Sequence, residues 1–276
     1  MPDTVALPPR SRPFDVRYMP GFTSMAWLCL IGLYAPLLIM AFFSFNESRS
    51  VTTFTDFSFR WYQIAADNAG VKDATILSLK LAALSTVFAT IAATMAGLAT
   101  TRTRSFKGQA FVFAVINQPL MIPEIVTAVG TLTFFGIIKQ VTGIQSFGFL
   151  VLAHTVFCIP FAYMPIRARL EDMDLTFEHV AADLYASPWK AFRYVTFPMM
   201  LPGIIAGAML AFVISLDDVI ISLLVAGAGE TTLPVWMIGQ LRRGLTPEVN
   251  AISTVLLGVT IIFVSFFFFL TFRKRK

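Results

Sequence analysis

Three carboxylic acids interrupt stretches of the sequence that are otherwise apolar. Glu124 lies in the run 108–138, and the adjacent Asp217 and Asp218 lie in the run 194–229. A charged side chain in the middle of a membrane costs ~2.5–3.5 kcal/mol on insertion scales, so such a residue usually faces a cavity or a partner. The acids therefore predict a pathway that accepts cations. The structural alternative is an interhelical hydrogen bond, or a basic partner in another subunit.

The depth of the acids favours the pathway. Counted from Gly108 and Gly203, Glu124 and Asp217 each lie about 15 residues into a helix, which is roughly 22 Å from its start. No Lys or Arg of the sequence lies at a matching depth to neutralise them. Adjacent helical residues point about 100° apart, and of the two aspartates we expect Asp217 to face the path.

Two aromatic residues precede the second apolar run, in the polar stretch 46–75. Trp61 and Tyr62 belong to the segment 57–64, which predicts a short helix at the outer surface. They could offer a cation–π surface, where an ammonium gains ~0.5–2 kcal/mol. A belt of aromatic side chains at the lipid headgroups is the alternative.

A second polar segment, 178–202, lies between the fourth and fifth apolar runs. Helical spacing places Val180, Leu184, Phe192 and Val195 where they could face a partner, with polar residues between them. An amphipathic element between two membrane spans is suited to passing force to a protein outside the bilayer.

The elements that must position these residues are apolar helices. The chain is 57% hydrophobic and 13% charged, which is outside ordinary soluble composition. Each of six runs holds the ~20 apolar residues that an α-helix needs to cross a membrane. We predict an all-α integral membrane protein of six transmembrane helices and a cytoplasmic coupling helix pair, from the runs 18–46, 81–101, 108–138, 140–166, 194–229 and 249–272.

The basic residues predict the orientation. With both termini cytoplasmic, the inner segments hold fourteen of the 21 Lys and Arg: Arg10, Arg12, Arg17, Arg102, Arg104, Lys107, Arg167, Arg169, Lys190, Arg193 and the four residues 273–276. This agrees with the positive-inside rule, so the net charge of +5 requires no nucleic-acid partner. We expect three parts: a cytosolic tail, first helix and outer loop over 1–71, a permease core over 72–268, and a basic cytosolic tail over 269–276.

Several activities are excluded by what the sequence lacks. Its two cysteines, Cys29 and Cys158, and its two histidines, His154 and His179, do not form a metal-ligand pattern. The sequence has no phosphate-binding loop and no nucleophile elbow. We therefore expect no enzyme and no cofactor in this chain.

Three segments together resemble a known family. The segment 178–202 resembles the cytoplasmic coupling loop of type-1 ABC importer permeases, whose pattern is Glu-Ala-Ala-x-x-x-Gly followed by a hydrophobic and proline-containing tail. The segments 215–222 (SLDDVIIS), 232–234 (TLP) and 242–251 (RRGLTPEVNA) are similar to the spermidine/putrescine branch, specifically its second permease subunit. The resemblance extends from about Ser44 to Thr254.

The resemblance assigns the coupling role to Glu178, His179, Ala181, Asp183, Tyr185, Ala186, Ser187 and Pro198. Two positions depart from the pattern. The usual Glu falls on His179, with Glu178 displaced by one residue, and the usual Gly falls on Tyr185. If the backbone there has a positive φ, Tyr185 is strained by about 1 kcal/mol or more.

The resemblance also implies the partners and the location. It implies a multi-pass subunit of the bacterial inner membrane that pairs with a homologous permease, two ATP-binding subunits and a periplasmic solute-binding protein. ATP and Mg would then bind to the ATPase subunits. The expected cargo is putrescine or spermidine, with an opine or amino-acid derivative as the alternative. A stand-alone ion-coupled transporter is disfavoured because the six runs show no inverted repeat.

Overall fold

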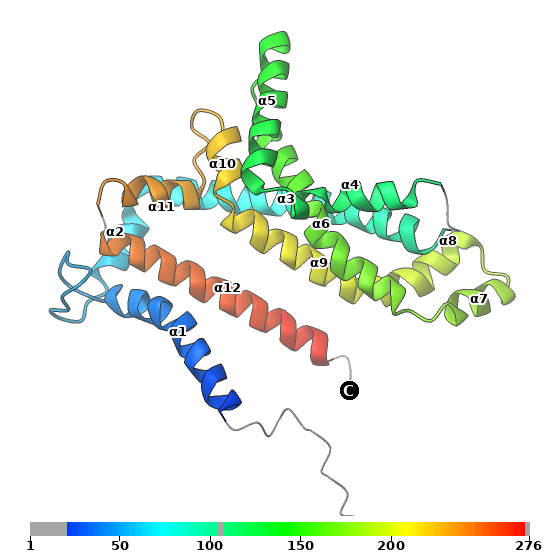
Figure 1. Ribbon diagram of the computed structural model, residues 1–276, viewed down its shortest axis with the longest axis horizontal. Helices are drawn as coiled ribbons and strands as arrows, with labels where there is room; N and C mark the ends of the chain where they lie inside the picture. The colour runs from blue at the N-terminus through cyan, green and yellow to red at the C-terminus, as the bar shows by residue number, and fades with distance from the viewer. Residues whose placement is uncertain (1–20, 104–106, 245, 274–276) are drawn as a thin grey trace, which may run out of the picture.

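The computed structural model describes residues 21–103, 107–244 and 246–273, and its long elements are helices joined by loops (Figure 1). The predicted tail up to Pro20 and the last three residues of the predicted basic tail lie outside the described residues. Within them, the only β-type pairing is a single bridge between Asn46 and Phe57. The helical elements are α1 (Phe22–Phe43), α2 (Arg60–Asp67), α3 (Ala69–Thr101), α4 (Gln109–Met121), α5 (Glu124–Thr142), α6 (Phe147–Glu171), α7 (Thr176–Asp183), α8 (Pro188–Ala191), η2 (Phe192–Thr196), α9 (Phe197–Asp217), α10 (Ile220–Val225), α11 (Leu233–Leu241) and α12 (Pro247–Arg273).

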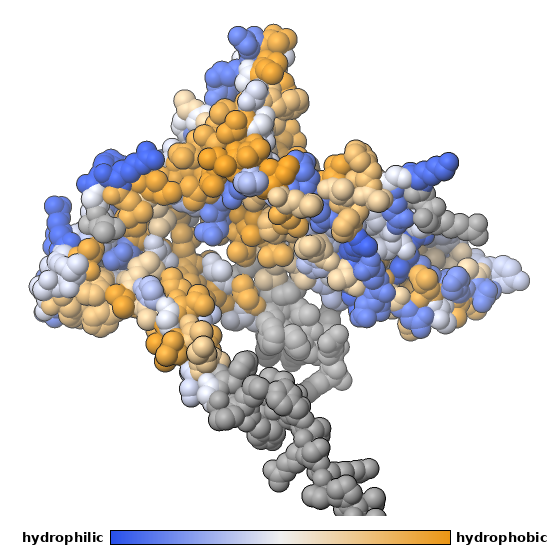
Figure 2. Space-filling model, viewed as in Figure 1, coloured by the Kyte–Doolittle hydropathy of each residue, from blue (hydrophilic) through white to orange (hydrophobic). Residues whose placement is uncertain are grey.

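The predicted apolar runs correspond to these helices. Five helical segments of the described chain are long and apolar enough to cross a membrane: Thr23–Phe43, Ala69–Thr101, Glu124–Thr142, Phe147–Glu171 and Pro188–Asp217. The sixth run forms α12, whose 27 residues give a length of about 40 Å. Hydrophobic side chains cover the shaft of α5 and the centre of the visible face, and hydrophilic ones gather near α7 and α8 (Figure 2). The predicted fold class is confirmed.

Three long helices, α3, α6 and α9, pack against one another and form the centre of the molecule. A ridge of small residues in α9 makes this packing possible, because Gly203, Gly207 and Ala211 are all buried. A Cβ atom on Gly207 would lie 2.5 Å from the carbonyl oxygen of Ala162 in α6. The backbones of α6 and α9 therefore approach as closely as glycine alone allows.

Two of the predicted spans are broken, which corrects the sequence-based depths. The run 108–138 is not one helix: α4 ends at Met121, Ile122 is extended, and α5 begins after Pro123 in a new direction (Figure 1). Proline disfavours a helical residue before it and supplies no N–H, so the helix stops there. Glu124 is consequently the first residue of α5 and does not lie 22 Å along a continuous helix.

The run 194–229 breaks between α9 and α10. Asp217 ends α9 and Asp218 is extended, with ψ 133°. In addition, α9 begins before Gly203, as part of a continuous helical segment from Pro188 through a π-helical turn to Asp217. Both breaks place acidic residues at helix ends, where the backbone also has unpaired polar groups.

Candidate functional site

The break after α9 holds a buried polar cluster centred on His154 of α6. The imidazole is completely buried, with Nδ1 2.9 Å from the Ser215 hydroxyl and Nε2 3.1 Å from the Ser222 hydroxyl. Nε2 also lies 3.3 Å from an Asp218 carboxylate oxygen. Since the Ser222 hydroxyl donates to Asp218 at 3.0 Å, the arrangement favours a proton on Nε2. The cluster joins α6, α9 and α10 through hydrogen bonds at membrane depth.

Asp218 has a structural position in this cluster. Its side chain accepts hydrogen bonds from the backbone N–H groups of Ile221 and Ser222 at the start of α10, and the residue is only 6% exposed. Glu124 is the first residue of α5 and is half-buried. For Asp218 the structure favours the interhelical alternative over an open path. The partner is a histidine, which a search for Lys and Arg misses; its signal in the sequence was the single histidine of the run 140–166.

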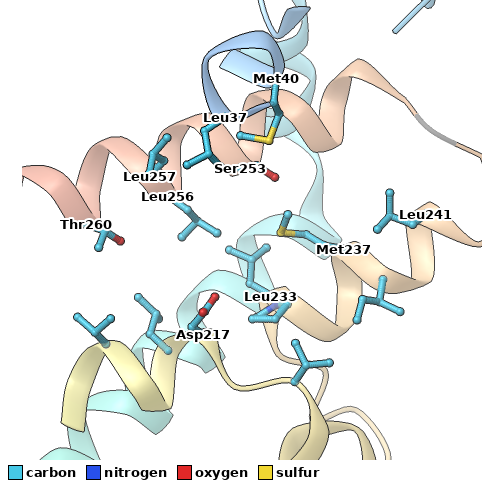
Figure 3. Close-up of a pocket in the computed structure, with 15 residues that line it drawn as sticks. Leu37, Met40, Asp217, Leu233, Met237, Leu241, Ser253, Leu256, Leu257 and Thr260 are labelled. Atoms are coloured by element: carbon cyan, nitrogen blue, oxygen red, sulfur yellow. The ribbon is translucent and has the colours of Figure 1, made fainter. Parts of the chain in front are cut away.

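Asp217 has a different environment from its neighbour. Its carboxylate is exposed and forms no hydrogen bond or ion pair with any residue that the structure describes. It lines a groove between α9, α11, α12 and α1 (Figure 3). The two aspartates therefore have different surroundings. The reason is the break in the helix and not the predicted 100° helical step, since Asp218 is extended with ψ 133°.

Of the two aromatic residues predicted to offer a cation–π surface, Trp61 has a structural role. Trp61 is 5% exposed, its indole N–H donates to the Asn46 carbonyl oxygen at 2.7 Å, and the Arg60 guanidinium carbon lies 5.7 Å from its ring centroid. The Tyr62 hydroxyl lies 2.6 Å from that of Ser44. Trp61 thus fastens α2 to the outer loop, and its ring is not open to a passing cation.

The segment between α6 and α9 forms the predicted surface helix pair. Helix α7 is followed by a left-handed turn at Tyr185, whose φ of 58° is the only positive value of a non-glycine residue in the described chain. The Ala186 N–H donates to the Ala181 carbonyl and the Tyr185 N–H to that of Ala182, which is a Schellman motif. Glycine is favoured at the left-handed position of this motif, so the expected strain at Tyr185 is present.

Glu178 fastens this segment to the membrane helices. One of its carboxylate oxygens lies 3.0 Å from Arg102 Nε, just after α3, and accepts from the Thr196 hydroxyl at 3.1 Å. The predicted coupling residues otherwise divide by exposure: His179, Asp183, Tyr185, Ser187 and Pro198 are exposed, Ala186 is half-buried and Ala181 is buried. Glu178 therefore supports the segment from within, and the exposed residues are free to meet a partner.

The fold and these sites define a class, helical proteins with several helices long and apolar enough to span a membrane and a polar helical segment between two of them. Among the described residues, no three His, Cys, Asp or Glu side chains are grouped so that they could hold a metal ion. The family described as binding-protein-dependent transport system inner membrane component matches residues 85–275, and the chain belongs to this family. The predicted family resemblance is confirmed.

Relatives of known identity match most of the chain. It is 38% identical over 229 residues to the putrescine transport system permease protein PotI of Escherichia coli (strain K12), covering 82% of each chain. It is 34% identical over 233 residues to the spermidine/putrescine transport system permease protein PotC of the same organism, covering 84% of this chain and 86% of PotC. The fold is similar to a bacterial ABC transporter involved in alginate import, with TM-score 0.65 and 15% identity, covering 92% of this chain and 98% of that one.

Proposed function

We propose that this chain is the transmembrane permease subunit of an ATP-driven importer of polyamines, putrescine or spermidine. The observation that carries the proposal is the 38% identity to a putrescine permease over 82% of both chains. The chain forms the translocation path with a homologous permease in the bacterial inner membrane, with both termini in the cytoplasm. A periplasmic binding protein delivers the cargo.

The segment 178–202 transmits the conformational change that ATP causes in the ATPase subunits. Two ATPase subunits bind ATP and Mg, and they contact α7 and α8. The contact residues are the exposed His179, Asp183, Tyr185 and Ser187, together with Pro198 at the start of α9. The Arg102–Glu178 ion pair ties this segment to α3, so movement of α7 is passed to the central helices. Large exposed apolar side chains at Leu184 and Trp189 on the same segment support a protein partner.

Some of the acidic and aromatic residues contact the cargo, and others hold the surrounding structure in place. Asp217 and Glu124 line the path and compensate the charge of the ammonium groups, and Tyr62 stands near the outer mouth. Asp218 fixes the break between α9 and α10 through His154 and Ser222. Trp61 fixes α2, which carries Tyr62, through its hydrogen bond to Asn46.

Uptake in proteoliposomes tests the proposal. The assembled complex of both permeases, the ATPases and the binding protein should import radiolabelled putrescine or spermidine only with ATP, and excess unlabelled polyamine should compete. Competition by an opine or an amino-acid derivative, without competition by polyamines, would assign the alternative cargo. Uptake by this chain alone, without an ATPase, would make it a stand-alone transporter and refute the importer function.

A further inference from the structure

A second apolar groove runs between α3 and α12. It has a volume of about 460 Å³ and is lined by fifteen residues, twelve of which are alanine, valine, leucine or isoleucine. Helix α2 lines one end of the groove, and it packs against both α3 and α12 at the end of the molecule opposite α7 and α8 (Figure 1). A groove of this volume is large enough to hold a small apolar ligand or one arm of a larger one.

The rim of the groove is exposed and its floor is buried. Ile76 and Leu79 of α3 form one side of the rim, Val255 and Val259 of α12 form the other, and all four side chains are about half exposed. Leu233 of α11, on the floor, is buried. Because α3 is one of the helices that are long and apolar enough to cross a membrane, this rim of aliphatic side chains opens toward hydrocarbon.

The length of the groove matches a large part of one lipid leaflet. Helix α3 rises about 10 Å from Lys72 to Leu79, and α12 rises about 12 Å from Ala251 to Val259. Both helices begin at the end where α2 lies, so the two walls run side by side from that end inward (Figure 1). Half of the hydrocarbon core of a bilayer is about 15 Å thick. An acyl chain that enters beside α2 would therefore contact the groove over most of its depth in the leaflet.

Lys72 carries the only charge among the fifteen residues. Its ammonium group forms no hydrogen bond or ion pair with any residue that the structure describes. The two hydroxyl groups of the lining already have partners within the chain. That of Tyr62 lies 2.6 Å from the Ser44 hydroxyl, and that of Thr75 donates to a backbone carbonyl oxygen of α3 at 2.7 Å. Lys72 is thus the one polar group that the groove offers to a ligand.

Acidic residues of this region do not compensate Lys72 within the groove, because none of Asp67, Asp73 and Glu248 lines it. Asp73 lines a different pocket, between α3 and α11, and Glu248 accepts a hydrogen bond from the Asn68 side chain at 2.9 Å. Lys72 is also the fourth residue of α3, where the partial positive charge at the amino end of the helix adds to its own. The groove therefore combines apolar walls with a positive charge at one end.

We propose that this groove binds a glycerophospholipid of the surrounding bilayer, in the leaflet opposite α7 and α8. One acyl chain contacts the walls, and the phosphate pairs with Lys72. A helix of a protein partner would need an acid of its own at the level of Lys72, whereas every glycerophospholipid carries a phosphate there. Since the groove has no second charged group, it recognises the phosphate and not the rest of the headgroup. Phosphatidylethanolamine and phosphatidylglycerol should bind alike, and diacylglycerol, which lacks the phosphate, should bind weakly.

Photolabelling of the assembled complex in a neutral detergent tests the site. The probe is a phosphatidylethanolamine that carries a diazirine midway along one acyl chain. Label should appear on residues 76–79 and 251–259. Unlabelled phosphatidylethanolamine and phosphatidylglycerol should both displace the probe, and diacylglycerol should not. Lys72→Gln should reduce this labelling about tenfold, the loss expected for a hydrogen bond to a charged group. Lys80→Gln, the same change on the same helix but outside the groove, should leave the labelling unchanged.

A second pair of variants covers a failure of Lys72→Gln to assemble. Val255→Trp fills the groove without changing its charge and should abolish labelling, whereas Val264→Trp, at an equally exposed residue of α12 outside the groove, should not. Displacement by diacylglycerol as effective as by the phospholipids would overturn the inference, as would labelling that survives Lys72→Gln or Val255→Trp. Labelling of the isolated chain that disappears on assembly would make the groove a protein interface and would also overturn it. None of these outcomes depends on the identity of the cargo.

Discussion

Replacing Tyr185 by glycine should stabilise the turn between α7 and α8. A residue other than glycine in the left-handed region costs roughly 1–2 kcal/mol, and the greater flexibility of glycine in the unfolded chain offsets part of this gain. The Tyr185 side chain is 98% exposed, so its removal sacrifices no contact within the chain. The net stabilisation is about 1 kcal/mol, which corresponds to roughly a fivefold shift in a local opening equilibrium.

Hydrogen exchange measures this shift in the isolated chain in detergent. The amide of Ala186, which donates to the Ala181 carbonyl at 3.0 Å, should become about fivefold better protected in Tyr185→Gly. Tyr185→Ala keeps a Cβ atom at the same φ, so it is the matched control and should leave protection nearly unchanged. Equal protection of the Gly and Ala variants, or lower protection of the Gly variant, would refute the strain argument.

The assembled complex separates backbone strain from docking. If Tyr185 contributes only a strained turn, Tyr185→Gly should preserve or raise transport-coupled ATP hydrolysis. A large loss of ATPase co-purification in both the Gly and Ala variants, with recovery in Tyr185→Phe, would show that the ring itself contacts the ATPase. The strain would then be a cost that the interface offsets.

Three further changes test the packing, the buried cluster and the coupling anchor. Gly207→Ala should destabilise the chain by about 1–3 kcal/mol, because the added Cβ would lie 2.5 Å from a carbonyl oxygen. The measurement is the thermal unfolding midpoint in detergent, which should fall. Gly239→Ala is the control and should be tolerated, because nothing lies within 4 Å of its added Cβ. His154→Ala should cost about 1–3 kcal/mol, because Ser215 and Asp218 each lose a buried hydrogen-bond partner. The readout is the fraction of folded protein on size exclusion, and full recovery of folded protein would contradict the structural role of the cluster. Glu178→Gln should lower uptake per ATP hydrolysed while the subunits still co-purify, and an unchanged ratio would contradict its role as the anchor of α7.

The sequence determined the class of the protein because hydrophobicity along a membrane helix is a local property. Runs of about 20 apolar residues predict helices without any knowledge of their neighbours. The sequence left the conformation of Tyr185 open, because this residue occupies a position where the family pattern has glycine; its φ of 58° shows that the turn is left-handed. These features depend on residues a few positions apart.

The tertiary structure decided which acids are satisfied and which are free. Asp217 and Asp218 are neighbours in sequence with the same side chain, yet one pairs with His154, 64 positions earlier, and the other opens into a groove. No pattern of spacing could show that pairing, because it depends on how α6 packs against the break between α9 and α10. The same holds for Trp61, whose burial depends on the loop that folds back to Asn46. Polar groups in a membrane must find partners over long sequence distances, and only the packed fold determines those partners.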